Sequence, residues 1–161
     1  MMILGIDPGT ATTGYAFLEQ NTRNKTQCEI AEFGVITTAK YERADIRLRI
    51  LYEDLSALIK KYRPLCAGVE KLFFTTNQKT AIEVAQARGV VLLVLAQHKI
   101  QVIELTPLQV KNYITGYGKA EKLQIQKMMQ QTFKLKSLPK PDDAADALAI
   151  AYCTSLIYRQ K

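Results

Sequence analysis

Two short apolar segments of this chain each end in a carboxylic acid, and this feature most constrains the fold. The segment ILGID, residues 3–7, ends in Asp7, and the segment LCAGVE, residues 65–70, ends in Glu70. Apolar runs of this kind are typical of strands buried on both faces of a sheet, where an unpaired carboxylate is costly. We therefore expect a turn, a basic side chain or a metal ion to neutralise each acid.

The rest of the chain alternates between strand and helix patterns. Strand patterns at residues 13–19 and 28–38 form an antiparallel meander with the first apolar segment. Leucines at helical spacing predict a helix over residues 43–62, which Pro64 ends. Beyond the strand at 65–70, we expect helices over residues 77–97, 106–114, 120–133 and 144–157 and a strand over residues 101–105. A meander followed by right-handed crossovers gives an α/β fold: a mixed five-stranded sheet with helices on both faces.

Composition bounds the class of protein. The 161 residues suit one domain spanning 1–161, with 48% apolar and 23% charged residues, as in a globular protein. No apolar run is long enough to span a bilayer, and Asp7 and Pro8 interrupt the N-terminal apolar run too early for a secretion signal. Three widely spaced cysteines suit reduced thiols in the cytoplasm. The net charge of +7 points to a polyanionic partner such as nucleic acid.

Four acids are candidates for one shared site. A crossover connection lays the strand at 65–70 parallel to the first strand, so Glu70 and Asp7 end at the same sheet edge if the two strands are neighbours. Asp143 and Asp146 lie three residues apart and share one face of the last helix. Such a cluster repels itself, and its oxygen ligands favour Mg²⁺ or Mn²⁺ over zinc. Two such ions about 4 Å apart activate water for phosphodiester hydrolysis.

Each of these residues also has a simpler interpretation. In this interpretation the DPGT segment is a common turn, Glu70 is a solvated strand end, and Asp142 or Asp143 caps the last helix. Three lysines bracket a glycine-bearing loop and form either a basic arm for phosphates or a solvated charge run; they are Lys111, Lys119 and Lys122.

Five motifs in one order carry a resemblance to a known family. They are GIDPGT followed by TGYA, then VEKLFF, QARG, VKNYITGYGKAEK and DDAADALAIA. The set resembles the RuvC family of Holliday junction resolvases, bacterial or phage endonucleases of RNase H-like fold. The resemblance implies a Mg²⁺-dependent homodimer, with two ions in each active site and Mn²⁺ as a substitute, that cuts two symmetry-related strands of a four-way DNA junction. It also implies cooperation with a junction-migrating helicase complex.

The resemblance also assigns roles to individual residues. It implies that the metal ligands and catalytic residues are Asp7, Glu70, Asp143 and Asp146. Asp142 is a rival for Asp143, but the flanking AADALAIA aligns Asp143 with the family acid. The implied DNA contacts are Lys111 and Lys122 near the active site and Phe73, whose ring stacks on a base at the crossover.

Lys119 and Arg88 complete the candidate DNA-binding set. Gly89, which follows Arg88 within the predicted second helix, is explained equally well by a dimer contact or by a bend against the sheet.

Three other functions compete with this prediction. A YqgF-type RNase H-like nuclease acting on RNA also has an aspartate followed by glycine after a strand. A non-catalytic protein that binds branched DNA requires degenerate acids, whereas all four are intact here. An actin-like ATPase using DPGT as a phosphate loop requires a second comparable domain, for which 161 residues are too few.

Overall fold

The computed structural model describes residues 1–21, 23–24, 27–71 and 78–158, with only the backbone described at residues 78–80. The elements along this part of the chain are β1 (Met2–Asp7), β2 (Thr12–Gln20), β3 (Cys28–Thr37), α1 (Ala44–Tyr62), β4 (Cys66–Glu70), α2 (Gln78–Gln97), β5 (Gln101–Leu105), α3 (Pro107–Thr115), α4 (Lys122–Thr132) and α5 (Asp142–Ile157). None of these helices is long and apolar enough to cross a membrane.

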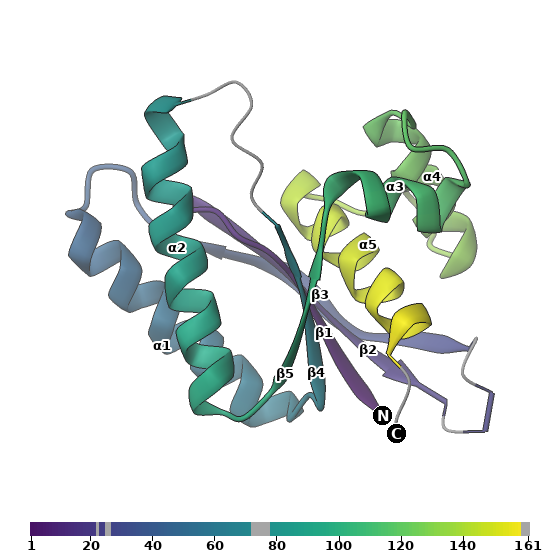
Figure 1. Ribbon diagram of the computed structural model, residues 1–161, viewed down its shortest axis with the longest axis horizontal. Coiled ribbons are helices and arrows are strands. Elements are labelled where there is room, and N and C mark those ends of the chain that lie inside the picture. Colours follow the sequence, from purple (N-terminus) through teal and green to yellow (C-terminus); the bar gives the residue numbers. More distant parts are fainter. Residues whose placement is uncertain (22, 25–26, 72–77, 159–161) are drawn as a thin grey trace.

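The strands form one five-stranded sheet in the order β3-β2-β1-β4-β5. β2 pairs antiparallel with both β1 and β3, whereas β4 pairs parallel with both β1 and β5. Figure 1 shows α1 and α2 on one face of this sheet and α5 on the other. The predicted mixed sheet with helices on both faces is therefore confirmed.

Alternating side chains on the strands supply two hydrophobic cores. Leu4, Ile6 and Phe17 are fully buried on the face that α1 and α2 cover, whereas Ala16 and Leu18 are buried on the face that α5 covers. This period of two is the one that a strand buried on both faces requires. The central strands therefore have no solvent-exposed face, and the acids at their ends lie next to apolar interior.

Most predicted boundaries agree with the structure to within two residues, and β5 matches exactly as residues 101–105. Thr106 caps α3 as expected, because its hydroxyl accepts a hydrogen bond from the Gln109 N–H and the Gln109 side chain bonds back to the Thr106 N–H. The last helix begins at Asp142, two residues earlier than predicted, so Asp142 and Asp143 both lie in its first turn. A helix N-terminus favours negative charge at this position.

The close approach of α5 to the sheet depends on two glycines. A Cβ at Gly5 in β1 would lie 2.3 Å from the Ala147 carbonyl oxygen, and a Cβ at Gly14 in β2 would lie 1.9 Å from the Asp143 carbonyl oxygen. Any side chain at these positions would push the α5 backbone away. Gly14 therefore fixes how close the first turn of α5, with its two aspartates, lies to the sheet.

We predict that Gly14→Ala destabilises the protein, because the added methyl group meets backbone that cannot rotate away. The expected loss is about 1–3 kcal/mol of unfolding free energy, measured by urea denaturation. Gly89→Ala is the matched control, because a Cβ there would meet nothing within 4 Å. That change should leave stability unchanged or raise it by up to about 1 kcal/mol. Equal stability of Gly14→Ala and the wild type would contradict the packing argument.

Candidate acidic site

Two of the predicted acids meet at the end of the central parallel strand pair. The register between β1 and β4 pairs Ile6 with Val69, so the next residue on each strand is an acid. The side chains of these two acids, Asp7 and Glu70, share a hydrogen bond. The sequence-based expectation that a parallel crossover brings them to one sheet edge is therefore confirmed.

The last helix brings two further acids to the same place. Asp143 and Asp146 both lie close enough to Asp7 for their negative charges to act on its carboxyl group, whereas Asp142 is not among the groups that do so. Asp142 instead accepts a hydrogen bond from the Gln126 amide of α4, with an N–O distance of 3.1 Å. Of the two neighbouring aspartates, Asp143 is thus the one that lies near Asp7.

Burial and mutual repulsion raise the pKa values of three of these acids. Burial, then the charge of Glu70 and the hydrogen bond to it, and then the charges of Asp146 and Asp143 raise the pKa of Asp7 from 3.8 to about 8. Burial is also the main cause that raises the pKa values of Glu70 and Asp146. Burial and the neighbouring acids therefore favour the protonated form of one carboxyl group in the Asp7–Glu70 pair.

A lysine from α4 partly compensates this negative charge. The Lys122 ammonium nitrogen lies 2.8 Å from Oδ2 of Asp146 and 3.4 Å from Oδ2 of Asp142. It also lowers the pKa values of Glu70 and Asp146 against the effect of burial. Burial alone would lower the pKa of Lys122, but the hydrogen bond and charge of Asp146, with Asp142, raise it. A basic side chain was one of the groups expected from the sequence to neutralise the acids, but the sequence did not identify Lys122 in that role.

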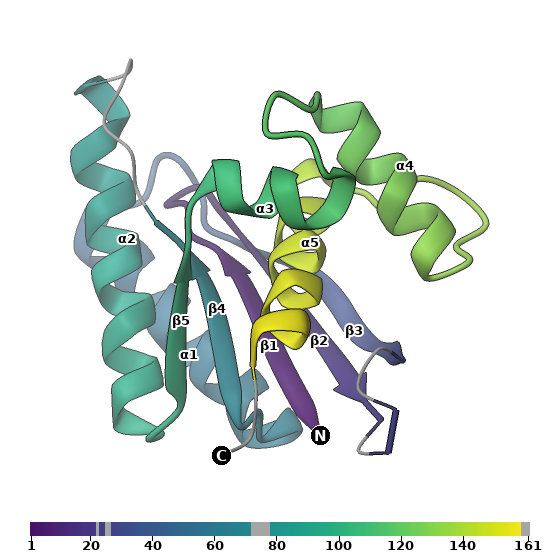
Figure 2. The same cartoon turned by 45° about the vertical axis from the view of Figure 1, so that its right-hand side comes forward.

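Two of the acids, Glu70 and Asp146, border a small hollow of about 210 Å³ between the end of β4, α5 and the two short helices α3 and α4. Figure 2 shows α3 and α4 beyond the same end of the sheet, next to α5. The residues lining the hollow are Glu70, Pro107, Val110, Lys111, Lys122, Ile125, Asp146, Ala149 and Ile150. Among the residues that the structure describes, no three His, Cys, Asp or Glu side chains are gathered as ligands for one metal ion. The acids are thus neighbours, but they do not form a ready-made metal cage.

The loop after Asp7 is fixed by hydroxyl groups. The Thr13 hydroxyl donates to the Gly9 carbonyl oxygen at 2.6 Å, and the Thr38 hydroxyl donates to the Thr10 carbonyl oxygen at 2.5 Å. Arg47 of α1 in turn donates to the Thr38 hydroxyl oxygen at 3.0 Å. These hydrogen bonds hold the segment between β1 and β2, and with it the end of β1, in place. Asp7 itself lies at the end of β1 beside Glu70, so it is more than the local cap of a turn.

Arg88 of α2 holds the end of the neighbouring strand. Its Nη2 lies 2.8 Å from Oε1 of Glu104 in β5, and its Nε donates to the Glu70 carbonyl oxygen at 3.2 Å. The Arg88 side chain is only 17% exposed, so its guanidinium group is engaged within the chain. The sequence did not identify Glu104 as the partner of Arg88. Its only sign there is an acid within the strand predicted at residues 101–105, and the structure pairs this acid with Val69 of β4.

The other predicted DNA contacts differ in how the structure describes them. Lys119 is exposed in the loop before α4, and Lys111 of α3 is half-buried beside Glu70 and Lys122 in the small hollow. Phe73 lies outside the described residues. α2 continues through Gly89 without interruption. A Cβ there would meet no atom within 4 Å, so packing within the chain does not require glycine at this position.

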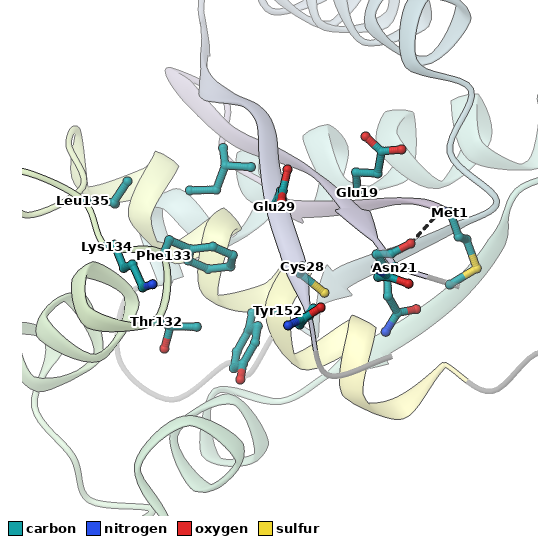
Figure 3. A pocket seen from close by; sticks show the side chains of 13 residues that line it. Met1, Glu19, Asn21, Cys28, Glu29, Thr132, Phe133, Lys134, Leu135 and Tyr152 are labelled. Carbon is teal, nitrogen blue, oxygen red and sulfur yellow. Dashed lines mark hydrogen bonds between the residues drawn. The ribbon is translucent and has the colours of Figure 1, made fainter. Parts of the chain in front are cut away.

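A larger hollow of about 1000 Å³ lies at the opposite end of the sheet (Figure 3). It is bordered by the start of β1, the hairpin between β2 and β3, the end of α4 and the middle of α5, with Met1, Cys28, Phe133 and Tyr152 among its lining residues. None of the four predicted acids lines it. The candidate site therefore lies at the smaller hollow, which is lined by two of the acids and by two lysines.

This sheet order, with acids at the ends of two adjacent parallel strands and at the start of the last helix, defines an RNase H-like α/β domain. The family model described as "Crossover junction endodeoxyribonuclease RuvC" matches residues 3–154. A protein of that name from Caldicellulosiruptor saccharolyticus is 44% identical over 165 residues, which cover 99% of this chain and 98% of the relative. The chain belongs to the RuvC family of crossover junction endodeoxyribonucleases.

Solved structures agree with this assignment. The structure of Thermus thermophilus RuvC superposes with a TM-score of 0.89 at 29% identity, covering 97% of this chain and 94% of that chain. T. thermophilus RuvC in complex with a Holliday junction substrate gives a TM-score of 0.86 at 26% identity, with the same coverage. The similarity therefore extends over nearly the whole fold, including the elements that border the acids.

The raised pKa of Asp7 predicts how stability depends on pH. Because this pKa is higher in the folded protein than in the unfolded chain, the folded protein binds the proton more tightly. In chelator, the free energy of unfolding should therefore fall as the pH rises from about 4 towards 8. Asp7→Asn should flatten this dependence and be more stable than the wild type near pH 8 by at least about 1.4 kcal/mol, the value of one pKa unit.

Urea denaturation across this pH range measures the effect. Asp142→Asn is the matched control, since this carboxylate points to α4, its side chain is 66% exposed and it does not act on Asp7. It should keep the pH slope of the wild type. Identical slopes for Asp7→Asn and the wild type would show that Asp7 carries no excess proton in the folded state.

Proposed function

We propose that this chain is a structure-selective endonuclease that resolves four-way (Holliday) DNA junctions by hydrolysing phosphodiesters in two symmetry-related strands. The observation that carries this proposal is the group of four acids, all present, at the end of the β1–β4 pair in a chain of the RuvC family. The T. thermophilus RuvC bound to a Holliday junction supports the choice of substrate.

We further propose that Asp7, Glu70, Asp143 and Asp146 are the catalytic residues and that they hold two Mg²⁺ ions, which Mn²⁺ can replace. The donor set fits in its chemistry, because carboxylate oxygens are the ligands that hard divalent cations take. The electrostatics fit as well, because burial and the neighbouring carboxylates raise the pKa of Asp7, and a bound cation would offset both effects. Such ions activate a water molecule and stabilise the attacking and leaving oxygens of a phosphodiester.

The chain's own residues prepare this site in three ways. The parallel register holds Asp7 beside Glu70, and Arg88 fixes the Glu70 backbone through its carbonyl oxygen. The first turn of α5 presents Asp143 and Asp146 from one face of the helix. The Asp7 and Glu70 side chains share a hydrogen bond, and this bond must break before both groups can act as anionic ligands.

Basic residues around the site are proposed to hold the DNA backbone. Lys111, Lys119 and Lys122 lie on α3, on the loop before α4 and at the start of α4, all at the acidic end of the sheet. Phosphate contacts of this kind position a substrate without reading its sequence. Phe73 remains proposed as a stacking residue. Arg88 remains a proposed DNA contact, although its ion pair with Glu104 supports a role in positioning β4.

We also propose how the protein assembles and where in the cell it works. Two symmetry-related cuts require two active sites, so we propose a homodimer, with a junction-migrating helicase complex as a further partner. We propose that residues 1–161 work as a single RNase H-like nuclease domain. All three cysteines have free thiols, which supports a reducing compartment such as the cytoplasm.

The decisive assay offers the purified protein three labelled substrates: a synthetic four-way junction, a linear DNA duplex and an RNA hairpin. With Mg²⁺ we expect paired symmetric nicks in the junction only. Asp7→Asn should reduce cleavage by at least about 100-fold while junction binding persists, because it removes a charge at the reacting centre and leaves the basic surface intact.

Each other outcome selects a competing function. Cleavage of the RNA hairpin would favour the YqgF-type nuclease, and tight junction binding without any cleavage would favour a non-catalytic binder. Equal cutting of duplex and junction would remove the structure selectivity. Full activity in chelator would remove the proposed metal dependence.

A further inference from the structure

Lys122 joins the start of α4 to two acids of α5. Lys122 is the first residue of α4, and its ammonium group forms ion pairs with both Asp146 and Asp142 of α5. The side chain of Asp146 is 33% exposed and that of Lys122 is 47% exposed. The pair therefore lies at the mouth of the acidic hollow, where both solvent and ions have access.

Two internal contacts divide the acids in this structure. The side chains of Asp7 and Glu70 share a hydrogen bond, while Oδ2 of Asp146 accepts a hydrogen bond from Lys122 at 2.8 Å. Among the described residues no three acids are gathered around one ion position. These contacts occupy oxygens that a divalent cation would need, and the ammonium group of Lys122 supplies positive charge at Asp146.

We infer that Lys122 is a built-in counter-cation of the active site: it occupies Asp146 in the metal-free protein, and a divalent ion must displace it to bind. This inference rests on the proposed function of the acids as metal ligands. Displacement releases the ammonium group, which becomes free to contact a phosphate oxygen of the DNA. Lys122 is thereby a positioning residue for the metal, through its effect on Asp146.

The local structure allows the side chain to move while the helix stays in place. Ile125 and Met129 of α4 are buried in the core with α5, which holds the helix. The Glu121 N–H donates to Oε1 of Gln124 at 2.8 Å, and the Gln124 N–H donates to the Glu121 carbonyl oxygen at 3.0 Å, so the first turn is fixed. Lys122 itself is half-exposed on a flexible four-carbon stem with three rotatable donors. The exchange therefore requires a rotation of side chains only.

Electrostatics set the direction and the size of the effect. A lysine within a few ångströms of a divalent cation repels it, and it also competes for the same carboxylate oxygen. Replacing Lys122 by methionine keeps the apolar stem and removes the charge. We expect Mn²⁺ to bind Lys122→Met about tenfold more tightly than the wild type, given the charge interactions at a partly exposed site.

Isothermal titration calorimetry with Mn²⁺, on metal-stripped protein without DNA, measures this affinity directly. Lys127→Met is the matched control, because Lys127 is an exposed lysine of the same helix with no ion pair among the described contacts. It should retain the wild-type affinity to within about twofold, which accounts for the general loss of one positive charge. Lys122→Arg keeps the cation and should stay closer to the wild type than Lys122→Met.

The outcomes separate this inference from the proposed function. A tighter Mn²⁺ affinity in Lys122→Met that disappears in the Asp146→Asn background supports the inference, whatever substrate the protein cuts. Equal affinity of Lys122→Met and Lys127→Met overturns it, even when the junction assay succeeds. Absence of Mn²⁺ binding in all variants overturns both the inference and the proposed metal site. Circular dichroism of each variant confirms that its helices are retained.

Discussion

Negative charge gathered beside an apolar interior is the constraint on which the rest of this structure depends. Carboxylates at the ends of two adjacent buried strands lose hydration and repel one another, and each effect opposes ionisation. The elevated pKa values of Asp7, Glu70 and Asp146 all have burial as their largest cause. A fold that keeps these acids together therefore needs rigid supports for the backbone and a source of positive charge for the side chains.

The supports and the charge come from different parts of the chain. β1, β4 and the first turn of α5 are fixed by strand register and by a backbone approach that leaves no space for a Cβ at Gly5 or Gly14. The compensating charge comes from Lys122, at the start of a short helix on the rim. Rigid elements thus set where the acids lie, while a flexible side chain adjusts their charge. This division suits a site whose cation content changes during its work.

Local patterns in the sequence were sufficient to predict most of this architecture. Apolar runs marked the central strands, helical spacing marked α1, and Thr106 followed by Pro107 marked the start of α3. The meeting of Asp7 and Glu70 followed from the parallel crossover alone. The prediction of Asp143 over Asp142 came from the family motif, and the structure accounts for its position by directing Asp142 to Gln126 and Lys122.

Two contacts at the site that the sequence did not predict join distant elements through long side chains. Arg88 reaches from α2 to β4 and β5, and Lys122 reaches from α4 to α5. No periodicity in the sequence encodes such pairs, because each depends on how a helix is placed against the sheet or against another helix. The four-acid cluster was predicted as a site in need of a cation, but the residue that supplies the positive charge became evident only in the structure.

The overall charge and the local charge of this protein have opposite signs, and each has a consequence for a polyanionic substrate. A net charge of +7 attracts a phosphate backbone from a distance, whereas the acid cluster repels it at close range. Lys122 reduces this repulsion at Asp146. This compensation is weaker than the charge of the divalent ions that we propose for the site. The same acids that exclude a phosphate from the metal-free site would therefore hold the ions that admit it.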